Sequence, residues 1–127
     1  MALTLHMHPL SSYCHKVLIA LYELDVPFEA VFLNLGDAAE RARFQALWPV
    51  GKMPVLEDRA AGVALPESSI IIEYLNTRFG GGLIPRDPGA ALEVRLQDRF
   101  FDLYVHAPMG CSPGTCCGRR ANAIPTA

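Results

Sequence analysis

Small hydroxyl groups and a thiol come directly before an apolar helical pattern near the start of the chain. Residues 9–17 read PLSSYCHKV and place Ser11, Ser12, Tyr13 and Cys14 where the pattern VLIALYEL begins. A helix N-terminus presents backbone N–H groups without intrahelical partners and the positive end of the helix dipole, so it favours an anion. These residues therefore predict an anion-binding site at the start of a helix. From this stretch alone, either serine could instead cap the helix.

Polar residues also stand at two later points where an element is expected to begin: Lys52 in GKMPVL, and Glu67 with Ser68 in LPESS. Taken alone, Lys52 would be a solvated cation ahead of a strand that an ordinary trans proline opens. Ser68 would be a helix cap beside an exposed acid. Neither stretch identifies a ligand by itself.

The length and charge of the chain exclude several classes of protein. Its 127 residues suffice for about one domain, and 11 lysines and arginines against 13 acidic residues give a net charge of −2. Without a basic run ahead of Arg119 and Arg120, we expect neither nucleic acid nor an anionic membrane as a partner. The N-terminus lacks a signal-peptide pattern, and no apolar run approaches the ~20 residues that span a bilayer, so we expect a soluble, cytoplasmic protein.

The four cysteines predict neither a disulfide framework nor a metal site. Cys14 stands alone, whereas Cys111, Cys116 and Cys117 crowd the last part of the chain. The sequence lacks the two C-x-x-C halves that are typical of a zinc site. We therefore expect reduced thiols and no bound metal.

Hydrophobic periodicity predicts a domain in which strands and helices alternate before a final hairpin. Alternation with period two indicates the first strand, and apolar residues from Cys14 to Leu24 fall on one face of the first helix. Asp37 is placed to cap the second helix. The expected strands cover residues 3–8, 28–35 and a hairpin within 53–67, and the expected helices cover 14–24, 37–48 and 67–81. The order β-α-β-α-β-β-α implies an α/β domain with a mixed four-stranded sheet.

A different pattern follows this domain. Residues 81–90 are rich in proline and glycine and predict a linker, and residues 91–109 predict a helix with two apolar stripes. Residues 110–127 lose all helical and strand periodicity, so we expect a disordered tail. The abrupt change suggests a chain cut short, or a change of reading frame, inside a second domain. The alternative is an ordinary flexible tail.

Three stretches, in their order and spacing, resemble the N-terminal thioredoxin-like domain of cytosolic glutathione transferases. They are PLSSYCHKVLIALYELDVPFE, GKMPVL and LPESSIIIEYL. The resemblance covers residues 3–80 and continues more weakly to about Met109. It implies a thioredoxin-like, glutathione-binding domain over residues 1–80, with residues 91–109 as the first helix of an incomplete all-helical domain.

The resemblance implies that the anion at the first helix is the thiolate of glutathione. Ser11 matches the serine of the family's active-site turn, and a hydroxyl that donates to sulfur favours its charged form. Ser12 could support this role but fits a helix cap better. Cys14 takes the second cysteine position of a C-x-x-C motif whose first position is Ser11, so a dithiol cycle is not available. We therefore expect Cys14 to be a small buried core residue, although catalytic support from it stays open.

Further positions match residues that bind glutathione in the family: Lys52, Met53, Pro54, Val55, Glu67 and Ser68. By the resemblance, the peptide bond before Pro54 is cis, and the Val55 backbone pairs with the cysteinyl backbone of glutathione. Lys52 would meet the glycyl carboxylate. Glu67 would accept the α-ammonium group, and Ser68 would bind the γ-glutamyl carboxylate through its hydroxyl and backbone N–H.

The resemblance therefore predicts a glutathione transferase that conjugates the glutathione thiolate to electrophilic small molecules. Glutathione would be a co-substrate rather than a permanently bound cofactor, and a homodimer is the usual assembly of the family. One alternative is a non-catalytic glutathione-binding module or an inactive truncated fragment. Another is a glutathione-dependent thiol reductase that uses Cys14. The residues do not identify the electrophile.

Overall fold

The computed structural model describes residues 2–109, which fall into two compact units that divide after Arg86. The first unit follows the predicted order β-α-β-α-β-β-α. Its elements are β1 (Leu3–Met7), α1 (Ser12–Glu23), β2 (Glu29–Phe32), α2 (Ala38–Leu47), β3 (Val55–Asp58), β4 (Val63–Pro66) and α3 (Ser68–Arg78). The tail expected over residues 110–127, with its cysteines, lies outside the described residues.

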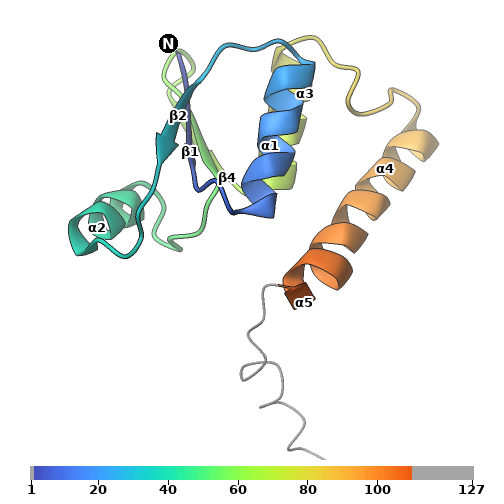
Figure 1. The fold of residues 1–127 in the computed structure, drawn as a ribbon. Helices are drawn as coiled ribbons and strands as arrows, with labels where there is room; N and C mark the ends of the chain where they lie inside the picture. Colours follow the sequence, from blue (N-terminus) through green and yellow to red (C-terminus); the bar gives the residue numbers. More distant parts are fainter. Residues whose placement is uncertain (1, 110–127) are drawn as a thin grey trace, which may run out of the picture. The chain divides into compact units, whose positions relative to one another are not determined.

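Four strands form one mixed sheet in the order β2-β1-β3-β4 (Figure 1). β1 runs parallel to β2, with Leu5 opposite Ala30, and antiparallel to β3, with Leu5 opposite Leu56. β3 and β4 form the predicted antiparallel hairpin. A parallel pair requires a crossover connection, which α1 provides between β1 and β2. The expected α/β fold with a mixed four-stranded sheet is therefore confirmed.

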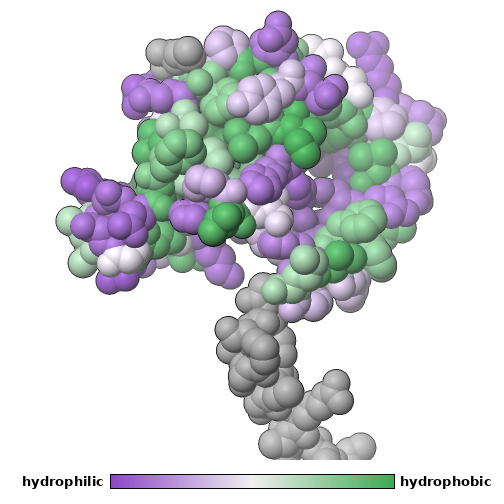
Figure 2. All heavy atoms as spheres, viewed as in Figure 1, coloured by the Kyte–Doolittle hydropathy of each residue, from purple (hydrophilic) through white to green (hydrophobic). Residues whose placement is uncertain are grey.

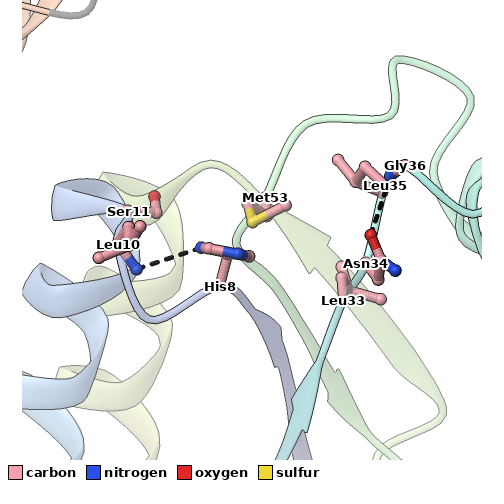
Figure 3. Close-up of a pocket in the computed structure, with 8 residues that line it drawn as sticks. All are labelled: His8, Leu10, Ser11, Leu33, Asn34, Leu35, Gly36 and Met53. Atoms are coloured by element: carbon pink, nitrogen blue, oxygen red, sulfur yellow. Dashed lines mark hydrogen bonds between the residues drawn. The ribbon is translucent and has the colours of Figure 1, made fainter.

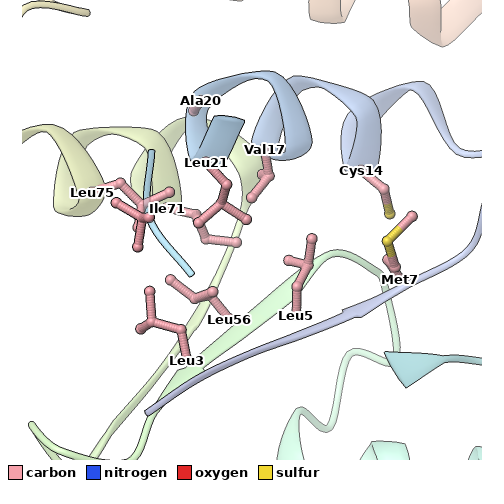
Figure 4. Packing of buried hydrophobic residues seen from close by; sticks show 11 residues of the cluster. Leu3, Leu5, Met7, Cys14, Val17, Ala20, Leu21, Leu56, Ile71 and Leu75 are labelled. Atoms are coloured by element: carbon pink, nitrogen blue, oxygen red, sulfur yellow. The ribbon is translucent and has the colours of Figure 1, made fainter. Parts of the chain in front are cut away.

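Helices cover both faces of this sheet. α1 and α3 lie side by side on one face, where Leu5, Val17 and Ile71 are fully buried in one apolar cluster (Figures 1 and 4). α2 covers the other face, where Phe44 packs with Leu33 in a second cluster. Because every second side chain of a strand points to the same face, Leu3, Leu5 and Met7 of β1 all lie in the first cluster.

The apolar stripe predicted for the first helix is buried. Cys14, Val17 and Leu21 are 0% exposed, and Leu18 and Leu24 pack against them as partly buried neighbours. Cys14 carries a free thiol within this cluster, as expected for a small core residue. Its side chain therefore contributes packing rather than surface chemistry.

The second unit contains a helical segment that begins at Pro88 rather than at the predicted Ala91. Asp87 caps it, because its Oδ2 accepts the backbone N–H of Ala90 at 2.8 Å, and proline suits a first helical turn. The segment comprises α4 (Pro88–Phe100), the π-helical stretch η1 (Phe101–His106) and α5 (Ala107–Met109).

This helical segment exposes large apolar side chains from both predicted stripes. Leu92, Leu96, Phe101, Tyr104 and Met109 are each more than half exposed. Figure 2 shows green, apolar side chains at the surface of the segment beside purple, polar ones. Within residues 2–109, no helix is both long enough and apolar enough to cross a membrane.

A buried carboxylate joins the hairpin to α3. Asp58, at the end of β3, is 1% exposed and accepts from Tyr74 Oη at 2.7 Å and from Arg78 Nε at 2.9 Å. The backbone N–H of Ala61 donates to its other oxygen at 3.1 Å. Burial by itself would raise the pKa of Asp58. The hydrogen bonds from Tyr74 and Ala61 and the charge of Arg78 outweigh burial, so the pKa is lowered from 3.8.

Replacing Asp58 with asparagine should destabilise the fold by roughly 2–3 kcal/mol, because Arg78 loses its ion-pair partner and Tyr74 loses a charged acceptor. The folded pKa lies below the unfolded value of about 3.9, so the carboxylate stabilises the fold above about pH 4. That contribution is lost as the pH falls through the folded pKa. Urea unfolding of the wild type and Asp58→Asn should therefore differ at neutral pH and converge in acid.

Tyr74→Phe is the matched control for this prediction, because it removes a single hydrogen bond to Asp58 and leaves the charge pair intact. Its cost should be about 1 kcal/mol. A difference between wild type and Asp58→Asn that does not change with pH would contradict the assignment.

Candidate functional site

A pocket of about 450 Å³ opens where α1 begins (Figure 3). This volume lies in the range of small-molecule sites. The lining residues come from the β1–α1 connection, the β2–α2 connection and the residue before Pro54: His8, Leu10, Ser11, Leu33, Asn34, Leu35, Gly36 and Met53. Ser11 and Met53, which the sequence analysis named separately, therefore line one pocket.

Ser11 is the N-cap residue of α1. Its Oγ accepts the backbone N–H of Cys14 at 3.4 Å, and its own N–H donates to the His8 carbonyl at 3.0 Å. The capping role expected for Ser12 thus belongs to Ser11, because Ser12 is already the first residue of the helix. Accepting one hydrogen bond occupies an oxygen lone pair and leaves the hydroxyl hydrogen for an acceptor in the pocket. Capping the helix and donating to a bound anion are therefore compatible.

The peptide bond between Met53 and Pro54 is cis, as the resemblance implied. Met53 lines the pocket, and Pro54 is buried. Val55 begins β3 and lies between His6 of β1 and Pro66 of β4 in the strand register. Because neighbouring strands flank Val55 on both edges, the register argues against the backbone pairing expected of it and favours Met53 for that role.

The start of α3 supplies a second set of polar groups. Glu67 is the N-cap residue, is exposed, and has a φ of +68°, a region that residues with side chains rarely adopt. Its side chain makes no capping hydrogen bond, so the first turn of α3 lacks the usual side-chain acceptor for its N–H groups. Ser68 follows as the first helical residue and is only 5% exposed.

A bridge between helices brings the starts of α1 and α3 together. Lys16 Nζ, from α1, donates to Ser69 Oγ in the first turn of α3 at 3.4 Å. Glu67 and Ser68 are not lining residues of the pocket, but the bridge places their helix start next to the helix that Ser11 caps. The exposed Lys52 also lies outside the lining. Among residues 2–109, no three His, Cys, Asp or Glu side chains gather as metal ligands.

The β2–α2 connection forms a wall of the pocket that sequence reasoning missed. Leu33 donates its N–H to a β1 carbonyl at 2.9 Å, and Asn34 donates its N–H to Glu40 Oε2 of α2 at 2.8 Å. Asn34 Oδ1 in turn accepts the Gly36 N–H at 3.1 Å (Figure 3). The sequence predicted Asp37 as the cap of the second helix, but it did not indicate that the residues just before this cap line a pocket with Ser11.

The first turn of α2 positions the carboxylate that holds this wall. Asp37 caps α2 as predicted, because its Oδ1 accepts the N–H groups of Ala39 at 2.8 Å and Glu40 at 2.9 Å. The hydrogen bonds from Glu40 and Ala39 lower the pKa of the Asp37 carboxyl from 3.8. Capping therefore fixes the helical turn from which the Glu40 side chain reaches back to Asn34.

The sequence matches the family model of the glutathione S-transferase N-terminal domain over residues 5–82. It is 36% identical over 107 residues to a glutathione S-transferase of Pseudomonas putida, a match that covers 84% of this chain and 46% of that protein. The chain therefore spans less than half the length of this relative.

Solved structures share the fold. A glutathione transferase homolog from Sulfitobacter with bound glutathione superposes with a TM-score of 0.75 at 26% identity, over 86% of this chain and 53% of that one. A diazinon-metabolizing glutathione S-transferase of the silkworm Bombyx mori gives a TM-score of 0.78 at 27% identity, over 92% of this chain and 60% of that one. The thioredoxin-like fold expected of the first unit is thereby confirmed.

Removing the Glu40 carboxylate should loosen the pocket wall. Glu40→Ala deprives the Asn34 N–H of a charged acceptor, so exchange of the Asn34 amide hydrogen should become roughly five- to tenfold faster. Glu40→Gln keeps an acceptor oxygen and should stay close to the wild type. Glu23→Ala, an exposed glutamate at the end of α1, is the control. Equal Asn34 exchange rates in Glu40→Ala and the wild type would show that the wall does not depend on Glu40.

Proposed function

The chain belongs to the glutathione S-transferase family, and on that premise we propose that it binds glutathione beside Ser11 and transfers the thiolate to electrophilic small molecules. One observation carries the proposal: Ser11 is both the N-cap of α1 and a residue of the pocket wall. An anion in that pocket meets a hydroxyl donor and the positive end of a helix dipole.

Ser11 acts on the ionisation of the thiol. A free thiol has a pKa of about 8.5 and is mostly protonated at neutral pH. A hydroxyl donates a stronger hydrogen bond to a thiolate than to a thiol, so Ser11 stabilises the charged form. Each pKa unit lowered corresponds to about 1.4 kcal/mol of preference for the thiolate. The proton leaves to solvent. The sulfur electron pair then forms a bond to the electrophilic atom, either as a leaving group departs with its bonding electrons or as a π bond opens and takes a proton from solvent.

Separate elements hold the rest of glutathione. The first turn of α3, which has no side-chain cap, and the buried Ser68 bind the γ-glutamyl carboxylate. Glu67 accepts the α-ammonium group, and its positive φ supports a binding role because strained residues cluster at ligand sites. The Met53 backbone pairs with the cysteinyl residue in the manner of an added strand. Lys52 meets the glycyl carboxylate.

A glutathione-binding module without turnover is the second candidate function. The match covers 46% of the Pseudomonas putida relative, and the residues proposed to hold glutathione all lie in the first unit. Conjugation of an electrophile at saturating glutathione distinguishes the two functions. A thiol reductase that uses Cys14 is disfavoured, because this thiol is 0% exposed within the core.

The setting of this activity follows from its chemistry. Glutathione is a consumed co-substrate, and a reducing cytoplasm supplies it in the thiol form. The large apolar side chains exposed on α4, Leu92 and Leu96, offer a contact for a second copy of the chain in a homodimer.

Ser11→Ala should raise the pKa of bound glutathione by about 1 while changing its affinity by less than about twofold, because the lost donor prefers thiolate over thiol. Ultraviolet absorbance of the thiolate across a pH series measures this pKa. Ser12→Ala, an exposed neighbour outside the pocket lining, is the control. Cys14→Ala should lower stability rather than activity. An unchanged thiol pKa in Ser11→Ala, together with loss of turnover in Cys14→Ala, would replace the serine mechanism with the reductase.

Ser68→Ala should weaken glutathione binding without altering the pKa of the bound thiol, since the γ-glutamyl carboxylate keeps its charge throughout. Losing a hydrogen bond to a charged group at a buried position should reduce affinity by roughly ten- to a hundredfold. Calorimetric titration measures the affinity, and Thr77→Ala, exposed on α3, is the control. An affinity of Ser68→Ala equal to that of the wild type would mean that a group other than Ser68 binds the γ-glutamyl carboxylate.

A further inference from the structure

His8 lies in the connection between β1 and α1 and lines the same pocket as Ser11 and Met53. We propose that the imidazole Nε2–H of His8 is a second hydrogen-bond donor to the thiolate of bound glutathione, an inference that rests on the function proposed above. The proposal follows from the bond that His8 makes on its other side and from the place of its ring in the pocket.

A backbone contact sets the tautomer of His8. Its Nδ1 accepts the N–H of Leu10 at 3.2 Å. A backbone N–H can only donate, so Nδ1 must carry the lone pair and the proton of the neutral ring resides on Nε2. The chain itself therefore makes Nε2 a donor.

His8 is a lining residue of the pocket, so its ring lies at the pocket wall. Figure 3 shows the His8 ring between Leu10 and Met53, with its second nitrogen on the side turned away from Leu10. The residue is partly buried. A sulfur anion in the pocket thus meets two preorganised donors, the Ser11 hydroxyl and the His8 imidazole.

In this tautomer His8 is a donor and not a base. The lone pair on Nδ1 is occupied by the Leu10 N–H, so the ring has no acceptor atom to offer the thiol proton. When the S–H bond breaks, the electron pair stays on sulfur and the proton passes to solvent. His8 therefore shifts the ionisation of the thiol without taking up its proton.

The His8 side chain can be replaced without removing the bond that holds Ser11. The Ser11 N–H donates to the backbone carbonyl of His8 at 3.0 Å, and that carbonyl is present whatever the side chain. A change in thiol ionisation on replacing the imidazole can therefore be separated from loss of the Ser11 backbone contact.

Two substitutions test the proposal, because each keeps the hydrogen-bonding role of one imidazole nitrogen and removes that of the other. His8→Asn places an amide oxygen near the Nδ1 position, so it keeps the acceptor for Leu10 and loses the donor. His8→Gln places an amide nitrogen near the Nε2 position, so it keeps the donor and loses the acceptor. We expect the pKa of bound glutathione to rise by about 0.5–1 in His8→Asn and by less than about 0.3 in His8→Gln. The pKa is measured by thiolate absorbance.

Hydrogen exchange of the Leu10 amide gives a second readout, which should stay protected in His8→Asn and become faster in His8→Gln. An equal rise of the thiol pKa in both variants would mean that His8 acts by shaping the loop, and it would overturn the proposal. Weaker glutathione binding with an unchanged thiol pKa would mean that His8 contacts the peptide part of glutathione rather than its sulfur, which also overturns the proposal. Failure of the wild type to bind glutathione in calorimetry would refute the proposed function itself, whatever Leu10 exchange shows.

Discussion

The packing of Met7 against Cys14 fixes both ends of the turn that carries Ser11. Met7 ends β1, Cys14 lies in the first turn of α1, and both side chains are buried in the same cluster, with their sulfur atoms facing each other (Figure 4). The short connection between them carries His8 and Ser11, so buried side chains anchor this connection at both ends. A cysteine suits this position because it packs as a small, polarizable apolar residue.

The order of the elements could be predicted because each element leaves a local signal. Period-two alternation marks β1, a stripe from Cys14 to Leu24 marks α1, and a single capping residue, Asp37, marks α2. These signals depend on neighbours within a few residues, and the structure agrees with all of them. The helical segment begins at Pro88, before the predicted Ala91, for an equally local reason: Asp87 caps it. The prolines on either side of Asp87 had indicated a linker there instead.

The pocket could be predicted only in part, because its remaining residues depend on contacts between distant elements. Asn34 becomes a pocket wall because β1 and α2 hold its connection in front of Ser11. His8 becomes a donor only when its ring lies beside Leu10 and faces Met53. Even the choice of Ser11 over Ser12 as cap depends on where the first turn of α1 closes, and two adjacent serines do not determine that point.

In the proposed function, ionisation of the glutathione thiol and conjugation of the thiolate to an electrophile have different structural requirements. The residues that would hold and ionise glutathione, from His8 to Ser68, all belong to the first unit, which has its own core. Ionisation requires donors aimed at sulfur, and binding requires partners for charges that do not change during the reaction. Neither requires the surface that orients an electrophile. In the proposed function, the pKa of the bound thiol therefore reports on the donors of the first unit, whereas turnover also depends on the surface that orients the electrophile.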